Sequence, residues 1–322
     1  MKNFAVFCGG YSSEFDISVK SAENVIKCFP DEFQVFKVIV SKSGWKVEYK
    51  QTLFDYNFKN PGFKFEKINI NFDFALVYIH GDPGENGKIQ AYLELVCIPF
   101  VNCNLIASSL TFDKWYCNNF LNAFEIPVAQ NLILSTHDKI EINEIIQKLG
   151  LPLFVKPTDA GSSFGVSKVK KAEELMPAVK SALKEGKWAM LESFLEGREV
   201  TCAVYRNNEG IQTLPITEIV SENEFFDFDA KYNGKSLEIT PARINKEEEL
   251  SVINVSKKIY ELLQLKSFVR IDFIIVGTIP YLVEVNTIPG FSNESIVPKM
   301  LECAQIDRKE FLRKIINFEL NL

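Results

Sequence analysis

The stretch that decides the fold is FVRIDFIIVGTIPYLVEVNTIPG, residues 268–290. Its two apolar runs, joined by a short connection around GTIP, predict a pair of facing strands in a hairpin. Because side chains alternate along a strand, Asp272 shares a face with Arg270, and Glu284 shares a face with Asn286. Two carboxylates and an amide oxygen that converge from paired strands suit magnesium, which keeps waters and substrate phosphates as its other ligands. The alternative is a solvated strand face that carries an Arg–Asp pair.

A second candidate site is the segment FVKPTDAGSSFGVSKV, residues 154–169. Lys156 ends a predicted strand, and a turn rich in glycine and serine follows it. The backbone N–H groups of such a turn can fold over phosphate oxygens and exclude water. The spacing is not that of a P-loop, which excludes that class of nucleotide site. Taken alone, the turn is more often part of a plain hairpin than of a nucleotide site. Its small residues are Gly161, Ser162, Ser163 and Gly165.

The first hundred residues alternate strands and helices, a pattern typical of a parallel α/β domain. FAVFC (4–8), QVFKVIV (34–40) and FALVYIH (74–80) are apolar enough for buried strands. The segment after GGYSS and the segment IQAYLELV have helical spacing. We therefore assign residues 1–103 to an N-terminal α/β domain, whose strand ends are the expected place for ligands.

The pattern changes after residue 103. Residues 104–188 predict a small central α+β lobe, with a helix around DKWYCNNFLNAF, the strand LFVKP and a helix over about 172–185. Residues 189–322 predict a larger C-terminal lobe with strands EVTCAVYR and IQTLPITEIV, a helix over about 245–264 and the hairpin. A chain of 322 residues is long for one hydrophobic core, so we expect clefts between lobes.

Composition excludes several classes of protein. No stretch approaches the roughly 18 apolar residues that a membrane span needs, and MKNFAVFCGG lacks the features of a secretory signal, so we expect a cytoplasmic protein. The seven cysteines contain no CxxC pair, which argues against a disulfide framework or a zinc ribbon. A net charge of −6 without a long basic run argues against nucleic acid as a partner.

In order along nearly its whole length, the chain resembles the D-alanine:D-alanine ligases of the ATP-grasp superfamily. The nucleotide motifs are shared by the superfamily, whereas GGxSxE, HGxxGExG, AKY and NTxPGxxxxS together are characteristic of the dipeptide ligases. The matching segments are GGYSSEFDIS (9–18), HGDPGENGKIQ (80–90), DK (113–114), VKPTDAGSSFGVSKV (155–169), LESFLEGREVT (191–201), FDAKY (228–232), TPARI (240–244), RIDF (270–273) and EVNTIPGFSNESIVPK (284–299).

The resemblance implies an ATP-grasp fold and a set of nucleotide contacts. Lys114 and Lys156 would hold the α and β phosphates, and Lys231 would reach the γ phosphate. Ser163 would contact the phosphates from the glycine turn. Glu192 and the backbone through Leu195 would meet the edge of the adenine, and Phe194 would provide a hydrophobic contact for it. Glu199 would accept hydrogen bonds from the ribose hydroxyls. The alternative for Glu199 is an exposed ion pair with Arg198.

For the amino acid substrates, the resemblance implies that Glu14 holds the ammonium of the first D-alanine, together with Ser162 and Tyr232. A carboxylate also suits a helix N-terminus through the helix dipole, which is the alternative for Glu14. Arg270 and the backbone N–H of Gly290 would stabilise the oxyanion. The resemblance also implies that the carboxylate of the second D-alanine lies at Ser295 and Ile296, at the start of the following helix.

Two further residues and one segment bear on the resemblance. His80 lies in the HGxxGExG motif, and its role stays open between catalysis and structure. Asp16 stands where the family often has an apolar or basic residue. The segment ESI (294–296) replaces a common HSL, which keeps Ser295 in register but changes its neighbours.

The reaction that the resemblance implies uses ATP and two Mg²⁺ or Mn²⁺ ions. The first D-alanine would become an acyl phosphate, which the amine of the second would attack, giving D-alanyl-D-alanine for peptidoglycan precursors. A homodimer is expected on the same ground. The alternatives are a D-alanine:D-lactate or D-alanine:D-serine ligase, and a non-catalytic nucleotide-binding paralogue. Tyr232 favours the dipeptide enzyme.

Overall fold

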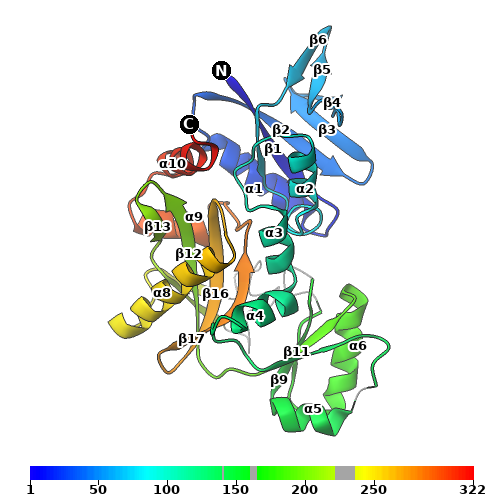
Figure 1. Cartoon of the computed structure of the whole chain (residues 1–322), viewed down its shortest axis with the longest axis vertical. Helices are drawn as coiled ribbons and strands as arrows, with labels where there is room; N and C mark the ends of the chain where they lie inside the picture. The colour runs from blue at the N-terminus through cyan, green and yellow to red at the C-terminus, as the bar shows by residue number, and fades with distance from the viewer. Residues whose placement is uncertain (140, 160–164, 222–235) are drawn as a thin grey trace.

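The computed structural model describes residues 1–139, 141–159, 165–221 and 236–322. The N-terminal domain lies at the top of Figure 1, the C-terminal sheet below it on the left, and the central lobe at the lower right. Each contains its own sheet. Within the described residues, no helix is both long and apolar enough to cross a membrane.

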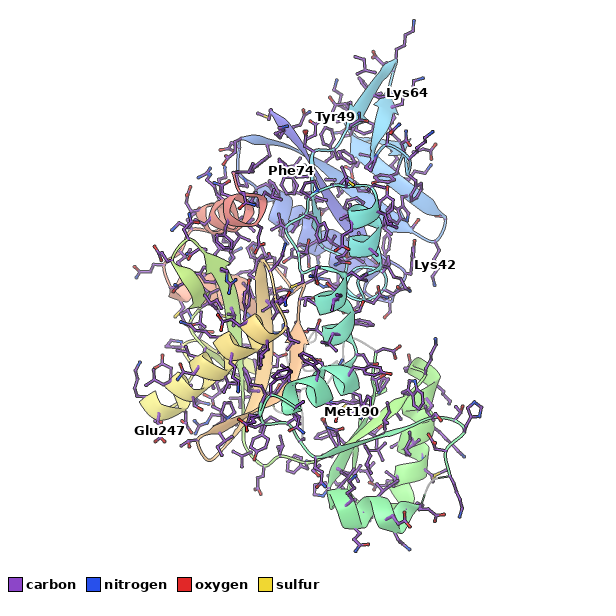
Figure 2. All side chains as sticks on the ribbon, viewed as in Figure 1. Lys42, Tyr49, Lys64, Phe74, Met190 and Glu247 are labelled. Atoms are coloured by element: carbon purple, nitrogen blue, oxygen red, sulfur yellow. The ribbon has the colours of Figure 1, made fainter. Side chains whose placement is uncertain are left out.

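The N-terminal domain is built on a five-stranded sheet with strand order β4-β3-β2-β1-β7. The predicted parallel pairing is confirmed for β2-β1-β7, whereas β3 and β4 add an antiparallel edge that the sequence analysis did not predict. A separate hairpin, β5–β6, projects from the domain with Lys64 on it (Figure 2). The bounds are β1 Lys2–Gly9, α1 Phe15–Lys27, β2 Phe33–Ser41, β3 Gly44–Tyr49, β4 Thr52–Asp55, β5 Gly62–Phe65, β6 Ile68–Asn71, β7 Phe74–Val77 and α2 Lys88–Leu95.

Aromatic residues fill the core of this domain. The ring of Phe4 on β1 packs edge-on against Phe29 and Phe33, with centroids 4.8 and 5.3 Å apart, and lies 5.8 Å from Phe74. Edge-to-face packing of this kind stabilises beyond the burial of apolar area. Phe29 lies just after the last residue of α1, so this packing ties the C-terminal end of that helix to the sheet.

The central lobe has a four-stranded antiparallel sheet with order β10-β9-β11-β8. Its core contains Leu153, Val155 and Leu191 from the sheet, packed against helices α5 and α6. β11 belongs to this sheet although the sequence-based division ends the central lobe at residue 188. The bounds are β8 Asn131–Leu134, α5 Ile142–Leu149, β9 Leu153–Pro157, β10 Ser167–Val169, a 3-10 turn η1 Ala172–Glu174, α6 Leu175–Glu185 and β11 Ala189–Ser193.

The C-terminal lobe has a sheet with order β15-β14-β12-β16-β17, with β13 also pairing with β12. The predicted single strand IQTLPITEIV is wrong: it divides into β13 and β14, because the chain leaves β12 around Pro215, which has no N–H to donate. The bounds are α3 Leu105–Phe112, α4 Lys114–Asn122, β12 Arg198–Asn207, β13 Gly210–Thr213, β14 Thr217–Ser221, β15 Ser236–Ile239, α8 Lys246–Leu262, β16 Phe268–Val276, β17 Ile279–Asn286, α9 Ile296–Cys303 and α10 Arg308–Leu320.

The two faces of the C-terminal sheet have different roles. Val200, Cys202 and Ile271 point into a core shared with α8, α3 and α4. On the opposite face, Ala203 and Ile219 pack with α9 and α10 in a core that continues into the N-terminal domain. The strand alternation therefore leaves the polar residues of β16 and β17 at the junction of the domains.

Candidate active site

The predicted hairpin places its four polar residues side by side. β16 and β17 pair antiparallel, with Arg270 opposite Asn286 and Asp272 opposite Glu284. The Arg270 guanidinium donates to both Asp272 oxygens, at 2.9 and 2.8 Å, and the Asn286 amide donates to Asp272 at 3.1 Å. The prediction that these side chains share one face is confirmed.

The donor set of this face fits a divalent cation. Oxygens of Asp272 and Glu284 meet across two strands, and each carboxylate has a basic side chain beside it. The Lys114 ammonium lies 3.4 Å from Glu284, and Arg270 holds Asp272. The Thr201 hydroxyl also donates to Asp272 at 2.5 Å. Among the described residues no group of three His, Cys, Asp or Glu is close enough for a metal, so a cation here would use the amide oxygen of Asn286 as well.

Two of the predicted nucleotide residues of the central lobe, Lys156 and Glu192, contact each other. The buried Lys156 ammonium at the end of β9 lies 2.6 Å from Glu192 on the neighbouring strand β11. Lys168 lies over the ring of Phe194, with its ammonium 4.1 Å from the ring centroid. This lobe therefore presents a cation, a carboxylate and an aromatic ring together.

Glu199 and Lys114 lie on the elements that join the central lobe to the C-terminal sheet. Arg198, the expected alternative partner of Glu199, instead donates to Glu248 at 3.2 Å, and neighbouring side chains on a strand point to opposite faces. The backbone N–H of Lys114 donates to the carbonyl of Thr158 at 2.9 Å, which ties α4 to the loop after β9.

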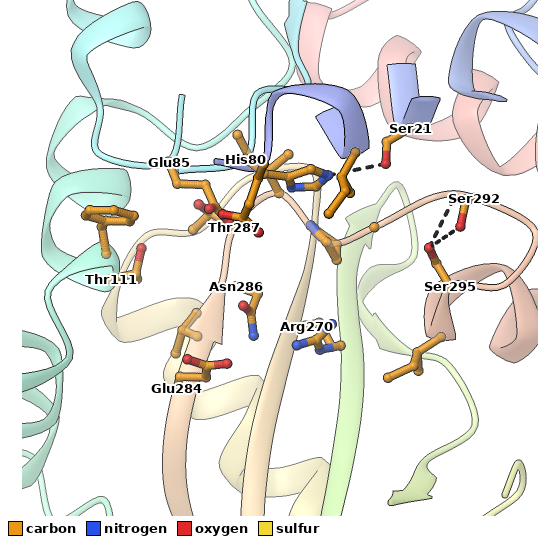
Figure 3. Close-up of a pocket in the computed structure, with 18 of the residues that line it drawn as sticks. Ser21, His80, Glu85, Thr111, Arg270, Glu284, Asn286, Thr287, Ser292 and Ser295 are labelled. Carbon is orange, nitrogen blue, oxygen red and sulfur yellow. Dashed lines mark hydrogen bonds between the residues drawn. The ribbon is translucent and has the colours of Figure 1, made fainter. Parts of the chain in front are cut away.

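A cavity of about 420 Å³ lies where the N-terminal domain meets the C-terminal sheet (Figure 3). It brings together eight of the predicted site residues, namely Glu14, Lys114, Arg270, Glu284, Asn286, Gly290, Ser295 and Ile296. Lys156, Glu192, Phe194, Leu195, Glu199 and Asp272 do not line this cavity. The predicted residues Ser162, Ser163, Lys231 and Tyr232 lie outside the described part of the chain.

Glu14 reaches the cavity because of the turn between β1 and α1. Gly9 and Gly10 have φ values of +88° and +116°, which side chains rarely adopt, and they turn the chain directly into the helix. Glu14 occupies the N-cap position of α1 and is buried, yet its side chain makes no capping hydrogen bond. A helix-dipole role, the alternative for Glu14, needs no capping hydrogen bond, so this geometry is compatible with both interpretations.

Two groups beside Glu14, the buried His80 and the half-buried Glu85, were given no definite role by the sequence analysis. Burial lowers the pKa of His80, and its Nε2 lies 3.3 Å from the Ser21 hydroxyl. Burial, followed by the nearby charge of Glu14, raises the pKa of Glu85 to about 8, while the Gly81 N–H donates to its carboxylate at 2.7 Å. Glu85 lies in the HGDPGENG segment, so that motif was the available signal.

The N-terminus of α9 forms the other end of the cavity. Ser295 is the N-cap residue but does not cap the helix with its side chain; its Oγ lies 2.8 Å from Ser292 Oγ and accepts the Ser292 N–H at 3.1 Å. A Cβ at Gly290 would approach Ser295 Oγ to 2.8 Å, so the close approach requires glycine. Backbone N–H groups at such a helix start attract a carboxylate.

Comparison with known proteins gives a consistent result. Residues 3–103 match the D-ala D-ala ligase N-terminus and residues 120–317 match the D-ala D-ala ligase C-terminus. The D-alanine--D-alanine ligase of Azobacteroides pseudotrichonymphae is 43% identical over 321 residues, covering 98% of this chain and 99% of the relative.

Solved structures agree with this likeness. The VanG D-Ala:D-Ser ligase from Enterococcus faecalis superposes with a TM-score of 0.89 at 29% identity, covering 99% of each chain. The D-alanine--D-alanine ligase from Bacillus anthracis complexed with ATP has a TM-score of 0.80 at 25% identity, covering 100% of this chain and 98% of that one. With its ATP-grasp fold, the chain therefore belongs to the D-alanine:D-alanine ligase family.

Proposed function

We propose that the chain joins two D-alanine molecules into D-alanyl-D-alanine at the expense of ATP, through a D-alanyl phosphate, for peptidoglycan precursors. Family membership over the full length supports this function. The observation that carries the proposal is the interdomain cavity, which holds a buried carboxylate from the N-terminal domain opposite a guanidinium and two further oxygen ligands.

In this proposal, ATP lies between the central and C-terminal lobes. Lys114 and Lys156 neutralise the α and β phosphates, Lys231 reaches the γ phosphate, and Ser163 belongs to the turn that covers them. The purine lies by Phe194, with Glu192 and Leu195 at its edge, and Glu199 accepts the ribose hydroxyls. The Lys156–Glu192 pair supports this placement, because it keeps a phosphate-binding cation beside a purine-edge acceptor.

Asp272, Glu284 and Asn286 would hold two Mg²⁺ or Mn²⁺ ions, which would offset the charge of the transferring phosphoryl group. Lys114 next to Glu284 supports this assignment, because this carboxylate already has a cation beside it. Metal-dependent turnover is therefore expected, with the protein positioning the reactants and excluding water.

Glu14, with Ser162 and Tyr232, would bind the ammonium of the first D-alanine. The carboxylate of this first D-alanine attacks the γ phosphate of ATP, and ADP leaves. Arg270 and the Gly290 N–H then stabilise the oxyanion that forms when the second amine attacks the acyl phosphate carbon and expels phosphate. The second carboxylate would lie at Ser295 and Ile296, at the start of α9.

Mass spectrometry of products tests this function. The protein is incubated with ATP, magnesium and a panel of D-alanine, D-serine and D-lactate, and the expected main product is D-alanyl-D-alanine. Predominant D-alanyl-D-serine or ester would replace the proposal with one of those specificities. Absence of any D-alanine-dependent ADP release would point to a non-catalytic paralogue.

A double variant tests the metal assignment. Glu284→Gln with Asn286→Ala removes two of the three proposed ligands and is expected to abolish D-alanine-dependent ADP release while the far-UV circular dichroism stays unchanged. Glu302→Gln, an exposed position on α9, is the control. Undiminished ADP release at saturating magnesium in the double variant would refute the assignment.

Three further proposals concern the molecule as a whole. We propose a homodimer, which sedimentation velocity would test, and a cytoplasmic location. We retain an N-terminal domain of 1–103. Because β11 pairs within the central sheet, and α3 and α4 share the C-terminal core, we propose 131–193 as the central lobe.

A further inference from the structure

Glu238 lines the interdomain cavity but has no role in the proposed reaction. It comes from β15, the edge strand of the C-terminal sheet, where it pairs with Ile219 of β14; Ile219 in turn pairs with Glu199 of β12. Because paired residues share a face, Glu238 lies on the same face of the sheet as Asp272 and Arg270. Its side chain is 15% exposed.

The carboxylate of Glu238 is joined to the helix that starts at Ser295. The Lys299 ammonium lies 3.0 Å from Glu238, and the Lys299 backbone N–H donates to the carbonyl of Ser295 at 3.4 Å. Lys299 therefore lies one turn from the proposed site of the second carboxylate. The Glu238–Lys299 pair borders that subsite.

Charges of both signs lie around this end of the cavity. Lys20 and Arg270 line the cavity and supply positive charge, Arg270 being paired with Asp272, and Lys299 lies beside the cavity through its contact with Glu238. The start of α9 adds the positive end of its dipole. Glu238 and Glu294 supply negative charge. Loss of the Glu238 charge would leave the Lys299 ammonium uncompensated beside the subsite.

The two kinds of second substrate respond differently to such a charge. A D-amino acid enters with an ammonium and a carboxylate, whereas a D-hydroxy acid enters with a carboxylate alone. An uncompensated ammonium attracts both carboxylates but repels only the substrate ammonium. The balance of charge at this position therefore favours one class of nucleophile over the other.

We propose that Glu238, by neutralising Lys299, selects an amino acid over a hydroxy acid as the second substrate. The inference rests on the proposed ligase function and adds a determinant of its specificity. Glu238 acts by neutralising the charge of Lys299, so it is a positioning residue and does not itself react.

The test is a double-mutant cycle read as a product ratio. Wild type, Glu238→Gln, Lys299→Met and the double variant receive ATP, magnesium, D-alanine and excess D-lactate at pH 7, and the ratio of ester to dipeptide is measured by mass spectrometry. We expect Glu238→Gln to raise this ratio about five- to tenfold. Lys299→Met should not raise it, and the double variant should return to within about twofold of wild type, because the uncompensated charge is gone.

The outcomes separate the inference from the function on which it rests. Dipeptide from the wild type establishes the function before any ratio is compared, and no dipeptide from the wild type overturns both. Given dipeptide, an unchanged ratio in Glu238→Gln overturns the inference. A ratio of ester to dipeptide that stays raised in the double variant also overturns the inference, because the effect of changing Glu238 would then not depend on the charge of Lys299. Glu302→Gln, at an exposed position on α9, the helix that also carries Lys299, controls for a general change in charge and should leave the ratio unchanged.

Discussion

At the scale of single residues, the site depends on carboxylates whose surroundings differ. Asp272 accepts hydrogen bonds from Arg270, Thr201 and Asn286, which fix both of its oxygens. Glu14 is buried at a helix N-terminus without capping it, and Glu85 is held by a backbone N–H. These surroundings suit the roles that we propose for Asp272 as a metal ligand and Glu14 as an ammonium acceptor, and they raise the pKa of Glu85.

Glu14→Gln is expected to raise the KM for the first D-alanine by roughly tenfold or more, because the amide keeps the shape but loses the charge that pairs with an ammonium. ATP affinity, measured separately by equilibrium binding, should change little. Asp16→Asn, an exposed neighbour in the first turn of α1, is the matched control. Equal loss of ATP and D-alanine binding in Glu14→Gln would mean that Glu14 serves the fold.

Glu85 is expected to make stability fall as pH rises. Its pKa of about 8 lies above the ordinary value of 4.5, so between these values the folded protein holds a proton that the unfolded chain has lost. This contribution is complete below about pH 4.5 and disappears as pH rises through 8. Glu85→Gln should therefore gain stability relative to wild type between pH 6 and pH 9.

Urea unfolding at pH 6 and pH 9 measures the effect of Glu85→Gln. Glu94→Gln, at an exposed position on α2, supplies the comparison. A difference between Glu85→Gln and wild type that stays constant with pH would show that Glu85 keeps an ordinary pKa.

At the scale of elements, apolar periodicity predicted the buried strands and failed for the short exposed ones. β1, β2, β16 and β17 are long and apolar on at least one face, so their pattern was clear. β4 and β6 have four residues each, mostly exposed, and their pairing depends on neighbouring strands rather than on their own composition. Pro215 interrupts an apolar run that looked continuous.

The residues of the candidate site show the same contrast between those that the sequence predicted and those that it did not. Asp272, Glu284 and Asn286 were predictable because two adjacent strands determine their arrangement. Glu85 and Glu238 were not assigned, because their presence in the cavity depends on how separate domains and an edge strand meet. Local pattern predicts which residues share a face, but only packing decides which faces meet.

Gly290→Ala is expected to disturb the start of α9. The added Cβ would come within 2.8 Å of Ser295 Oγ, so Ser295 must move and its contact with Ser292 must break. We expect the KM for the second D-alanine to rise roughly tenfold, with the melting temperature close to that of wild type. Gly277→Ala, where nothing lies within 4 Å of the new Cβ, is a control for added side-chain volume away from the site, although its positive φ disfavours alanine. A normal KM in Gly290→Ala would remove Ser295 from the subsite.

At the scale of the whole molecule, the site exists only because the N-terminal domain and the C-terminal lobe keep a fixed position relative to each other. One hydrophobic core runs across the junction, joining α9 and α10 to the N-terminal sheet. One buried polar contact crosses it as well: the Tyr78 hydroxyl, directly after β7, donates to the carbonyl of Pro289 at 2.7 Å. Pro289 precedes Gly290, so this hydrogen bond ties the loop that contains Gly290 to the domain that carries Glu14.

Tyr78→Phe should therefore lower both stability and substrate affinity. Loss of the hydroxyl leaves a buried carbonyl without its donor, a cost of about 1–2 kcal/mol. The matched control is Tyr260→Phe, because the Tyr260 hydroxyl is equally buried and donates to the Ser267 carbonyl at 2.8 Å within one lobe. Both variants should lose similar stability in urea unfolding, but only Tyr78→Phe should raise the KM for D-alanine. If the two variants bind D-alanine equally well, the other contacts across the junction hold the domains in place, among them the hydrophobic core and the Lys309–Asp31 and Arg313–Glu32 ion pairs. The Tyr78 bond then contributes stability without positioning the site.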